Sequence, residues 1–178
     1  YEEPVNTELP GSFDWREQPL AECIHPIRDQ GACGSCWAFA TSEVASDRYC
    51  LGAGGKKEDN LVFSPQYLVD CDTGASACSG ANTINVIPWI YKNGIPTDSC
   101  YPYESGETKK GGKCHSGTCT DEFGLATEWN KFYFEDYKTF SKKSYTVLQE
   151  EIFLNGPVYF SMNVYSDLKS YTGGVYVK

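Results

Sequence analysis

Cys36 is the residue of this 178-residue sequence that is best placed to act as a nucleophile. It lies in residues 30–40, Gln-Gly-Ala-Cys-Gly-Ser-Cys-Trp-Ala-Phe-Ala, where two closely spaced cysteines precede an apolar run that predicts the start of a helix. A thiolate at a helix N-terminus is stabilised by the positive end of the helix dipole. If the glycine-containing loop turns back, the Cys36 N–H and the Gln30 amide converge on one oxyanion. These residues predict acyl transfer through a thiol.

Other uses of the Cys-x-x-Cys pattern stay open at this point: half of a zinc site, a redox pair, or ordinary disulfide cysteines. A redox pair is disfavoured because the preceding residues 27–30 are too polar for a buried strand. Zinc would need a second close pair, and the candidates Cys71/Cys78 and Cys114/Cys119 are more widely spaced. We therefore predict no metal site and no cofactor, and surface or loop positions for the two histidines, His25 and His115.

The composition bounds the class of protein. Nine cysteines, an odd number, indicate an oxidising compartment with four disulfides and one free thiol, although the count alone also allows metal binding. The net charge of −9, without a long basic run, argues against nucleic acid as a partner. No apolar stretch predicts a membrane span, and the N-terminus lacks the form of a signal peptide, so we expect a processed chain. A lysosome-like acidic vesicle or a secreted setting is compatible with this composition.

Four helices are predicted from local signals. The first begins at Ser35 or Cys36 and stops at residues 52–55, Gly-Ala-Gly-Gly. A short one over residues 66–71 follows Ser64-Pro65, and a third over residues 83–93 is closed by Gly94, with Pro88 expected to kink or destabilise it. The fourth begins at Thr146 and ends at residues 155–157, Asn-Gly-Pro.

The C-terminal part has a different pattern. Apolar and polar residues alternate over residues 158–165, which predicts a half-buried strand. Aromatic residues after residue 123 suggest strands or a long aromatic-lined loop. The shift from helical to strand-rich patterns near residue 120 is the candidate lobe boundary.

The sequence resembles the papain family of cysteine proteases, in particular its cathepsin B-like branch. Residues 30–39 resemble the active-site block, including the Cys-Gly-Ser-Cys-Trp signature. Further similar stretches follow in family order: residues 9–16, Leu-Pro-Gly-Ser-Phe-Asp-Trp-Arg; residues 64–71, Ser-Pro-Gln-Tyr-Leu-Val-Asp-Cys; residues 155–158, Asn-Gly-Pro-Val; residues 164–167, Val-Tyr-Ser-Asp; and residues 173–176, Gly-Gly-Val-Tyr.

The resemblance implies an α+β fold with two lobes. Residues 11–120 would form a helical lobe that carries the nucleophile, and residues 121–178 the first part of an incomplete, antiparallel β-barrel-like second lobe. Residues 1–10 would be an N-terminal extension. The implied disulfides are Cys23 with Cys50, Cys33 with Cys78, Cys71 with Cys114, and Cys100 with Cys119, which leaves Cys36 free as the nucleophile and Gln30 as the oxyanion donor.

The resemblance also identifies what this sequence lacks. The family's catalytic histidine and asparagine have no counterpart after Cys36 in this chain, so a second, smaller chain is expected to supply them. The family's long histidine-bearing loop is short here, in residues 101–113, which favours an endopeptidase; a dipeptidyl peptidase heavy chain is the rival subtype. A non-catalytic papain-like binding module and a disulfide-rich structural protein are the alternatives from other classes.

Substrate contacts are likewise implied by the resemblance. The backbone at Gly80 and Ala81 would pair with an extended substrate, and Thr83 and Ser161 would lie near the main specificity pocket, although ordinary helix and strand positions explain those two equally well. The implied partners are protein or peptide substrates and propeptide or protein inhibitors.

Overall fold

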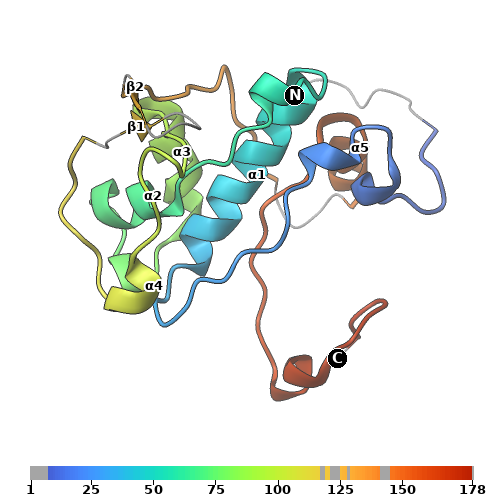
Figure 1. Ribbon diagram of the computed structural model, residues 1–178. Helices are drawn as coiled ribbons and strands as arrows, with labels where there is room; N and C mark the ends of the chain where they lie inside the picture. Colours follow the sequence, from blue (N-terminus) through green and yellow to red (C-terminus); the bar gives the residue numbers. More distant parts are fainter. Residues whose placement is uncertain (1–7, 117–118, 121–124, 128, 141–144, 178) are drawn as a thin grey trace.

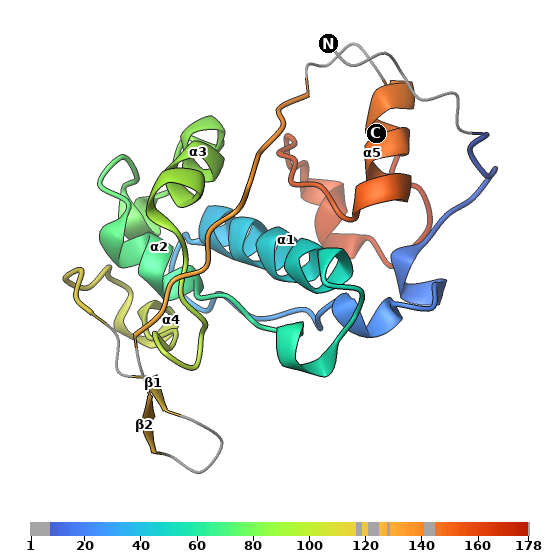
Figure 2. The same cartoon turned by 90° about the horizontal axis from the view of Figure 1, so that it is seen from above.

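The computed structural model describes residues 8–116, 119–120, 125–127, 129–140 and 145–177. Its helices and strands are, in chain order, α1 (Cys36–Gly52), α2 (Pro65–Cys71), α3 (Thr83–Asn93), α4 (Ser105–Thr108), β1 (Cys119–Thr120), β2 (Ala126–Thr127) and α5 (Tyr145–Asn155). Short 3-10 turns cover Trp15–Glu17, Ala21–Cys23, Lys57–Asp59, Ala77–Ser79 and Ser166–Ser170. In Figure 1 and Figure 2, α1 lies between α2 and α3 on one side and α5 on the other. No helix among the described residues is long and apolar enough to cross a membrane.

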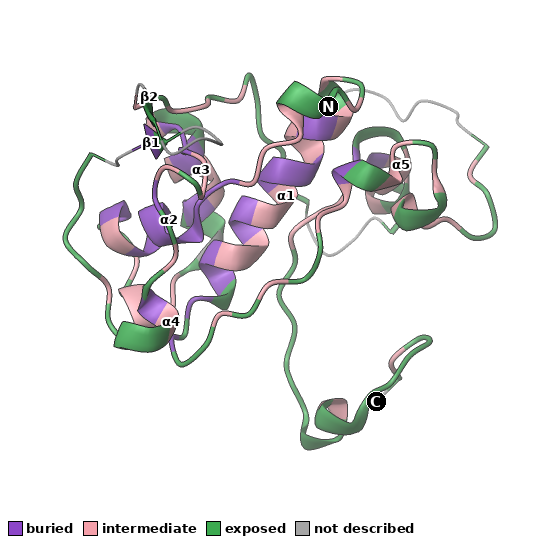
Figure 3. Ribbon diagram, viewed as in Figure 1, coloured by how far each residue is buried: buried purple, intermediate pink, exposed green. Residues whose placement is uncertain are grey.

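The helix α1 is the central element because small side chains let its neighbours approach closely. Its buried residues include Thr41, Ser42 and Ser46, and their hydroxyl groups donate to carbonyls of the preceding turn of the same helix. The Ser46 hydroxyl also accepts a hydrogen bond of 2.8 Å from the backbone N–H of Phe63. Buried polar atoms are tolerated only when they are paired in this way. Figure 3 shows the buried positions gathered on α1, α2 and α3.

The ends of α2 and α3 follow the predicted local signals. The Ser64 side chain accepts from the Tyr67 N–H, with Pro65 at the first helical position. Gly94 ends α3 with a positive φ of 71°, a conformation that favours glycine. The predicted disruption at Pro88 does not stop α3, which continues to Asn93. Buried Val86 and Ile90 on either side of this proline anchor the helix in the core.

The segment before α1 runs antiparallel to it. Cys23 is bonded to Cys50 near the C-terminal end of α1, the His25 ring contacts Asp47, and Arg28 pairs with Glu43 one turn further toward the N-terminus. As the segment proceeds from Cys23 to Arg28, its partners on α1 move from the C-terminal end of the helix toward its N-terminus. The segment therefore delivers Gln30 to the N-terminal end of α1, where Cys36 lies.

The helix α5 docks on α1 through Arg48. The Arg48 guanidinium donates to the carbonyls of Pro157 (2.6 Å) and Gly156 (3.1 Å) and pairs with the Glu151 carboxylate at 2.7 Å. A basic side chain placed at the last carbonyls of a helix is stabilised by the negative end of its dipole. Gly156 is buried with φ +111°, and a Cβ there would lie 2.8 Å from Leu51. The predicted stop after residue 155 is therefore also the docking point.

The predicted strand over residues 158–165 is not formed. These residues are extended, and the strands among the described residues are only the two-residue pair β1 and β2. Phe160 is 70% exposed and Val164 is 68% exposed, although alternation predicts burial of one face. A strand needs a neighbouring strand for its backbone hydrogen bonds, and alternation alone does not supply one. Figure 1 shows the segment after α5 leading away from the helices.

Aromatic residues beyond residue 120 pack against the helical core. Trp129, Phe132 and Phe134 are partly buried against it, and Phe132 forms an antiparallel bridge with Ile95. This stretch is the predicted aromatic-lined loop rather than a set of strands. The lobe boundary near residue 120 remains a prediction, with this contact across it.

Candidate active site

Cys36 is the free cysteine of the chain and is exposed at the first position of α1. The four disulfides join Cys23 to Cys50, Cys33 to Cys78, Cys71 to Cys114 and Cys100 to Cys119, the same pairs that the resemblance implies. Four bridges account for eight of the nine cysteines, so none of the alternatives that required a paired Cys36 describes this chain. The thiol is accessible to solvent at the positive end of a 17-residue helix.

The loop before Cys36 is folded tightly against the loop of residues 77–79. The Cys33–Cys78 disulfide joins them, and the Gly34 N–H donates to the Cys78 carbonyl at 2.9 Å. A Cβ at Gly34 would lie 2.3 Å from that same oxygen, so a glycine is required. Trp37 adds a hydrogen bond of 3.1 Å from its indole N–H to the Ala77 carbonyl. The direction in which Cys36 points is set by this cross-linked turn.

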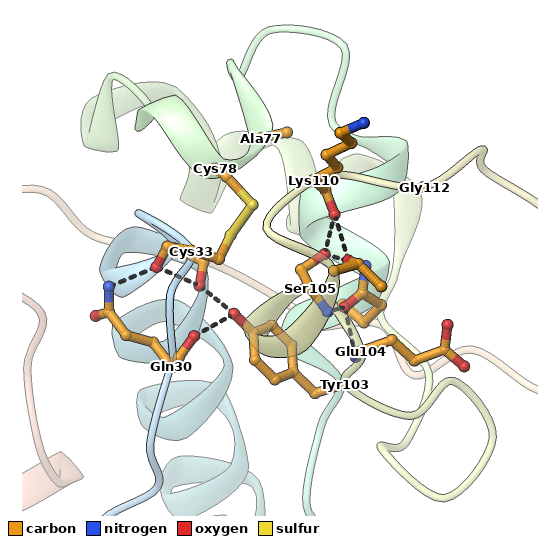
Figure 4. The surroundings of a disulfide bond; sticks show 12 residues. Gln30, Cys33, Ala77, Cys78, Tyr103, Glu104, Ser105, Lys110 and Gly112 are labelled. Carbon is orange, nitrogen blue, oxygen red and sulfur yellow. Dashed lines mark hydrogen bonds between the residues drawn. A yellow bond between two sulfur atoms is a disulfide. The ribbon is translucent and has the colours of Figure 1, made fainter.

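Gln30 lies beside the same turn. Its side-chain amide donates to the Cys33 carbonyl at 2.7 Å, and its backbone carbonyl accepts from the Tyr103 hydroxyl (Figure 4). A side-chain amide carries two N–H donors, so one bond to Cys33 leaves a second hydrogen. Gly31 makes the turn possible, with φ +60° and no room for a Cβ against the backbone of Gly106.

The residues expected to contact substrate lie in two different places. Gly80 has φ +105°, its carbonyl accepts from the Ser76 N–H at 2.9 Å, and Ala81 packs against the core beside it. Thr83 is the first residue of α3, and its side chain lies outside the described part of the structure. Ser161 is exposed in the extended segment after α5, apart from these elements, and lines neither of the two described cavities.

His25 lies far from Cys36. Its ring contacts Asp47 at 2.7 Å, and Asp47 follows Cys36 by eleven positions in α1, which is about 16 Å along the helix axis. The residue lies in the loop-like segment before α1, as predicted, but only 8% of its side chain is exposed. His25 therefore cannot be the imidazole partner of the thiol. His115 is exposed, as predicted, and stacks on Tyr101 with ring centroids 4.4 Å apart.

One group of described side chains has the composition of a metal site. Potential ligand atoms of His25, Glu43 and Asp47 all lie within 4.8 Å of one another, beside a cavity of about 300 Å³. Both carboxylates are already engaged, since Asp47 accepts from the His25 backbone N–H and pairs with His25 Nδ1, and Glu43 pairs with Arg28; the His25 Nε2 is buried without a partner. A guanidinium at this position repels a cation, so the group is an ion-pair network that fixes the segment before α1.

This network predicts a pH-dependent contribution to stability. The hydrogen bond that the His25 ring donates to the Asp47 carboxylate is the main cause that raises the pKa of His25 above its usual value, and burial opposes it. A raised pKa in the folded state gives stabilisation that is fully present below the unfolded pKa and is lost as the pH rises through the folded value. We expect His25→Gln to cost about 1 to 3 kcal/mol near pH 5 and less near pH 9.

Urea unfolding at the two pH values measures this difference. The matched control is His115→Gln, which changes an exposed histidine that has no ion pair among the described residues. Equal costs of His25→Gln at acidic and alkaline pH would contradict the assignment.

Comparison with known proteins identifies the family. A model of the papain family cysteine proteases matches residues 9–178. The chain is 37% identical to "Cathepsin B-like CP3" of Giardia intestinalis over 96% of the chain and 54% of that protein. It is 36% identical to "Cathepsin B-like cysteine proteinase 5" of Caenorhabditis elegans over 97% of the chain and 58% of that protein. The chain thus spans about half the length of the curated relatives it matches.

A solved structure agrees with the sequence comparison. "proCathepsin B S9 from Trypanosoma congolense" superposes with a TM-score of 0.63 at 28% identity, over 84% of this chain and 50% of that one. The fold of this chain is therefore papain-like. Within this fold the chain has its helical core, its four disulfides and the free cysteine at the start of α1. This chain belongs to the papain family of cysteine proteases, and the relatives described above are named as cathepsin B or cathepsin B-like proteins.

Proposed function

We propose that this chain is the larger part of a cysteine endopeptidase that hydrolyses peptide bonds through Cys36. The observation that carries the proposal is the free, exposed thiol at the N-terminus of α1, in a chain where every other cysteine is paired. Membership of a cysteine protease family supports a reaction at that thiol.

In the proposed mechanism the Cys36 thiolate attacks the carbonyl carbon of a peptide bond and forms a carbon–sulfur bond. The negative charge that develops on the carbonyl oxygen is stabilised by the Cys36 N–H and the Gln30 amide. The tetrahedral intermediate collapses, and the C–N bond breaks as an imidazolium donates a proton to the leaving amine. Water then hydrolyses the thioester and restores the thiol.

The imidazole and the group that orients it come, in this proposal, from a part of the protein beyond this chain. His25 is held by Asp47, about 16 Å along α1 from Cys36, and His115 is stacked on Tyr101, so we assign neither to this role. The chain spans about half of its curated relatives, which leaves room for such a part. The exposed residues 160–165 favour the same partner, since added strands would complete the β-rich second lobe and cover them.

Substrates are proposed to be polypeptides cleaved internally. The loop of residues 101–113 contains no histidine, and Lys110, one of its three lysines, contacts Ser105 through its backbone carbonyl. An extended substrate would pair with the backbone at Gly80 and Ala81. Thr83 and Ser161 remain proposed pocket residues.

A propeptide or a protein inhibitor is the other proposed partner, because the similar solved structure, proCathepsin B S9, is named as a proenzyme. The proposed setting is a lysosome-like acidic vesicle or the extracellular space. Four disulfides support an oxidising compartment.

Digestion of a long unstructured peptide by the native protein tests the function. We expect internal cleavage products by mass spectrometry, together with a second, non-identical chain in the intact-mass spectrum. Stepwise release of C-terminal dipeptides would contradict the endopeptidase assignment and identify an exopeptidase. A single chain of 19.8 kDa that binds peptides without cleaving them would identify a binding module instead.

A further inference from the structure

The hydroxyl of Tyr103 connects the two sides of the turn that presents Cys36. It donates to the Gln30 carbonyl at 2.8 Å and lies 2.6 Å from the Ser35 hydroxyl (Figure 4 shows Tyr103 beside Gln30). A phenol has one proton, and the Gln30 carbonyl can only accept. The Ser35 hydroxyl is therefore the donor in the second bond. Tyr103 thus links the backbone of the oxyanion donor to the residue that precedes the nucleophile.

This arrangement diverts Ser35 from its usual role. Serine is favoured at the N-cap because its side-chain oxygen accepts from an N–H of the first helical turn. Ser35 is the N-cap of α1 and is fully buried, yet its side chain makes no capping hydrogen bond. The N–H groups of Ala38 and Phe39 donate to the Ser35 backbone carbonyl at 2.9 and 3.1 Å, but the Ser35 side chain accepts from no N–H of the first turn. N–H groups at the start of a helix that are not taken up by a cap can stabilise a thiolate or an oxyanion at Cys36.

The position of Tyr103 is fixed by its surroundings. Its ring packs edge-on against Phe39 of α1, with centroids 4.7 Å apart. Three residues after Tyr103, the Gly106 carbonyl accepts from the N–H of Ala32, in the turn before Cys36, at 3.0 Å. The side-chain oxygen of Gln66 accepts from the backbone N–H groups of Glu104 and Ser105, both at 2.9 Å. The hydroxyl is thus held by α1, α2 and the active-site turn together.

We infer that Tyr103 is a positioning residue for Cys36: its hydroxyl holds the Gln30 backbone in place and keeps the Ser35 side-chain oxygen away from the N–H groups of the first turn of α1. The kinetic consequence rests on the proposed function, whereas the consequence for thiol reactivity does not. Without the Tyr103 hydroxyl, the Ser35 side-chain oxygen keeps only its longer contact of 3.5 Å with the Cys33 carbonyl and can turn to accept from α1, and the Gln30 backbone carbonyl loses its anchor.

Tyr103→Phe in the full-length protein tests the inference, because it removes the hydroxyl and keeps the ring on Phe39. We expect kcat for peptide hydrolysis to fall about tenfold to hundredfold with little change in KM, since misplaced donors act mainly in the transition state. The rate of Cys36 alkylation by iodoacetamide, followed by peptide mapping, should fall about two- to fivefold. The melting temperature should stay within about 5 °C of the wild type.

Two further variants make the test specific. Tyr91→Phe is the matched control, because Tyr91 is an exposed tyrosine of α3 that is not part of the Cys36 turn. The double variant Ser35→Ala, Tyr103→Phe also removes the Ser35 side-chain oxygen, which could otherwise accept from the first turn of α1. The double variant should recover most of the lost alkylation rate, which a purely structural role of Tyr103 would not produce.

The outcomes separate the two proposals. Equal kcat and alkylation rates in Tyr103→Phe and Tyr91→Phe would overturn the positioning role. A loss of activity in Tyr103→Phe that is accompanied by a large drop in melting temperature would also overturn the positioning role. Slower alkylation in Tyr103→Phe, in a protein that cleaves no peptide, would support the positioning role and refute the proposed peptidase function.

Discussion

Replacing Cys36 by serine is expected to lower the rate of peptide hydrolysis by about 10⁴-fold or more. A serine hydroxyl at this position is a far weaker nucleophile than a thiolate, and no other free cysteine in the chain can replace it. The measurement is kcat/KM on a peptide that the wild-type protein cleaves. Labelling with a thiol-directed epoxide, located by peptide mapping, gives an independent readout.

The fold should not change in this variant, because the Cys36 side chain is exposed and makes no disulfide. The unfolding transition of Cys36→Ser is therefore the control, and we expect it to overlay the wild type. Undiminished hydrolysis by Cys36→Ser, or epoxide labelling at another residue, would refute Cys36 as the nucleophile.

Removal of the Cys33–Cys78 disulfide is expected to lower both the free energy of unfolding and the rate of peptide hydrolysis. The bridge closes a loop with a sequence separation of 45. Under the chain-entropy model such a loop contributes about 4 kcal/mol, which is a large share of the stability of a typical domain. The double variant Cys33→Ser, Cys78→Ser should also lose more than about tenfold in kcat, because the turn that holds Gln30 loses its cross-link.

The Cys71–Cys114 disulfide offers a closely matched control. Its sequence separation is 43, so its loss should cost nearly the same stability, about 4 kcal/mol. It joins the end of α2 to an exposed loop rather than to the turn before Cys36. We expect Cys71→Ser, Cys114→Ser to keep its activity per folded molecule. Urea unfolding and active-site titration measure the two quantities, and equal losses of activity in both variants would contradict a role of the Cys33–Cys78 bridge in positioning.

The helix ends were predictable because their signals are local. Ser64 and Pro65 at the start of α2, and Gly94 and Gly156 after α3 and α5, act within one turn of the residues they terminate. Such signals are complete in the sequence itself. Pro88 was misleading because its cost is also local, whereas the burial that outweighs it is tertiary.

Long-range features could not be predicted in this way. The alternation in residues 158–165 specifies which side chains would share a face, but a strand forms only where a second strand supplies hydrogen bonds. Burial of His25 depends on Asp47, 22 positions away, and the role of Tyr103 depends on residues about 70 positions earlier. Nothing near these residues signals such contacts.

The candidate nucleophile itself was predictable, since residue types and spacing around Cys36 carry the chemistry. The pairing of the other cysteines came from the resemblance to the papain family, because spacing alone permits many pairings. What neither source gave is the support of the site, in which Tyr103 holds Gln30 and Ser35 together.

The docking of α5 on Arg48 has a consequence for how the protein folds during synthesis. All eight paired cysteines lie between residues 23 and 119, whereas Glu151, the ionic partner of Arg48, follows it by 103 positions. At about 5 to 20 residues per second, the 26 positions from Cys119 to the start of α5 at Tyr145 take the ribosome roughly 1 to 5 seconds. The cross-linked helical core can therefore close before α5 exists. The contact between α5 and α1 is a late step, added to a framework whose paired cysteines have all been synthesised.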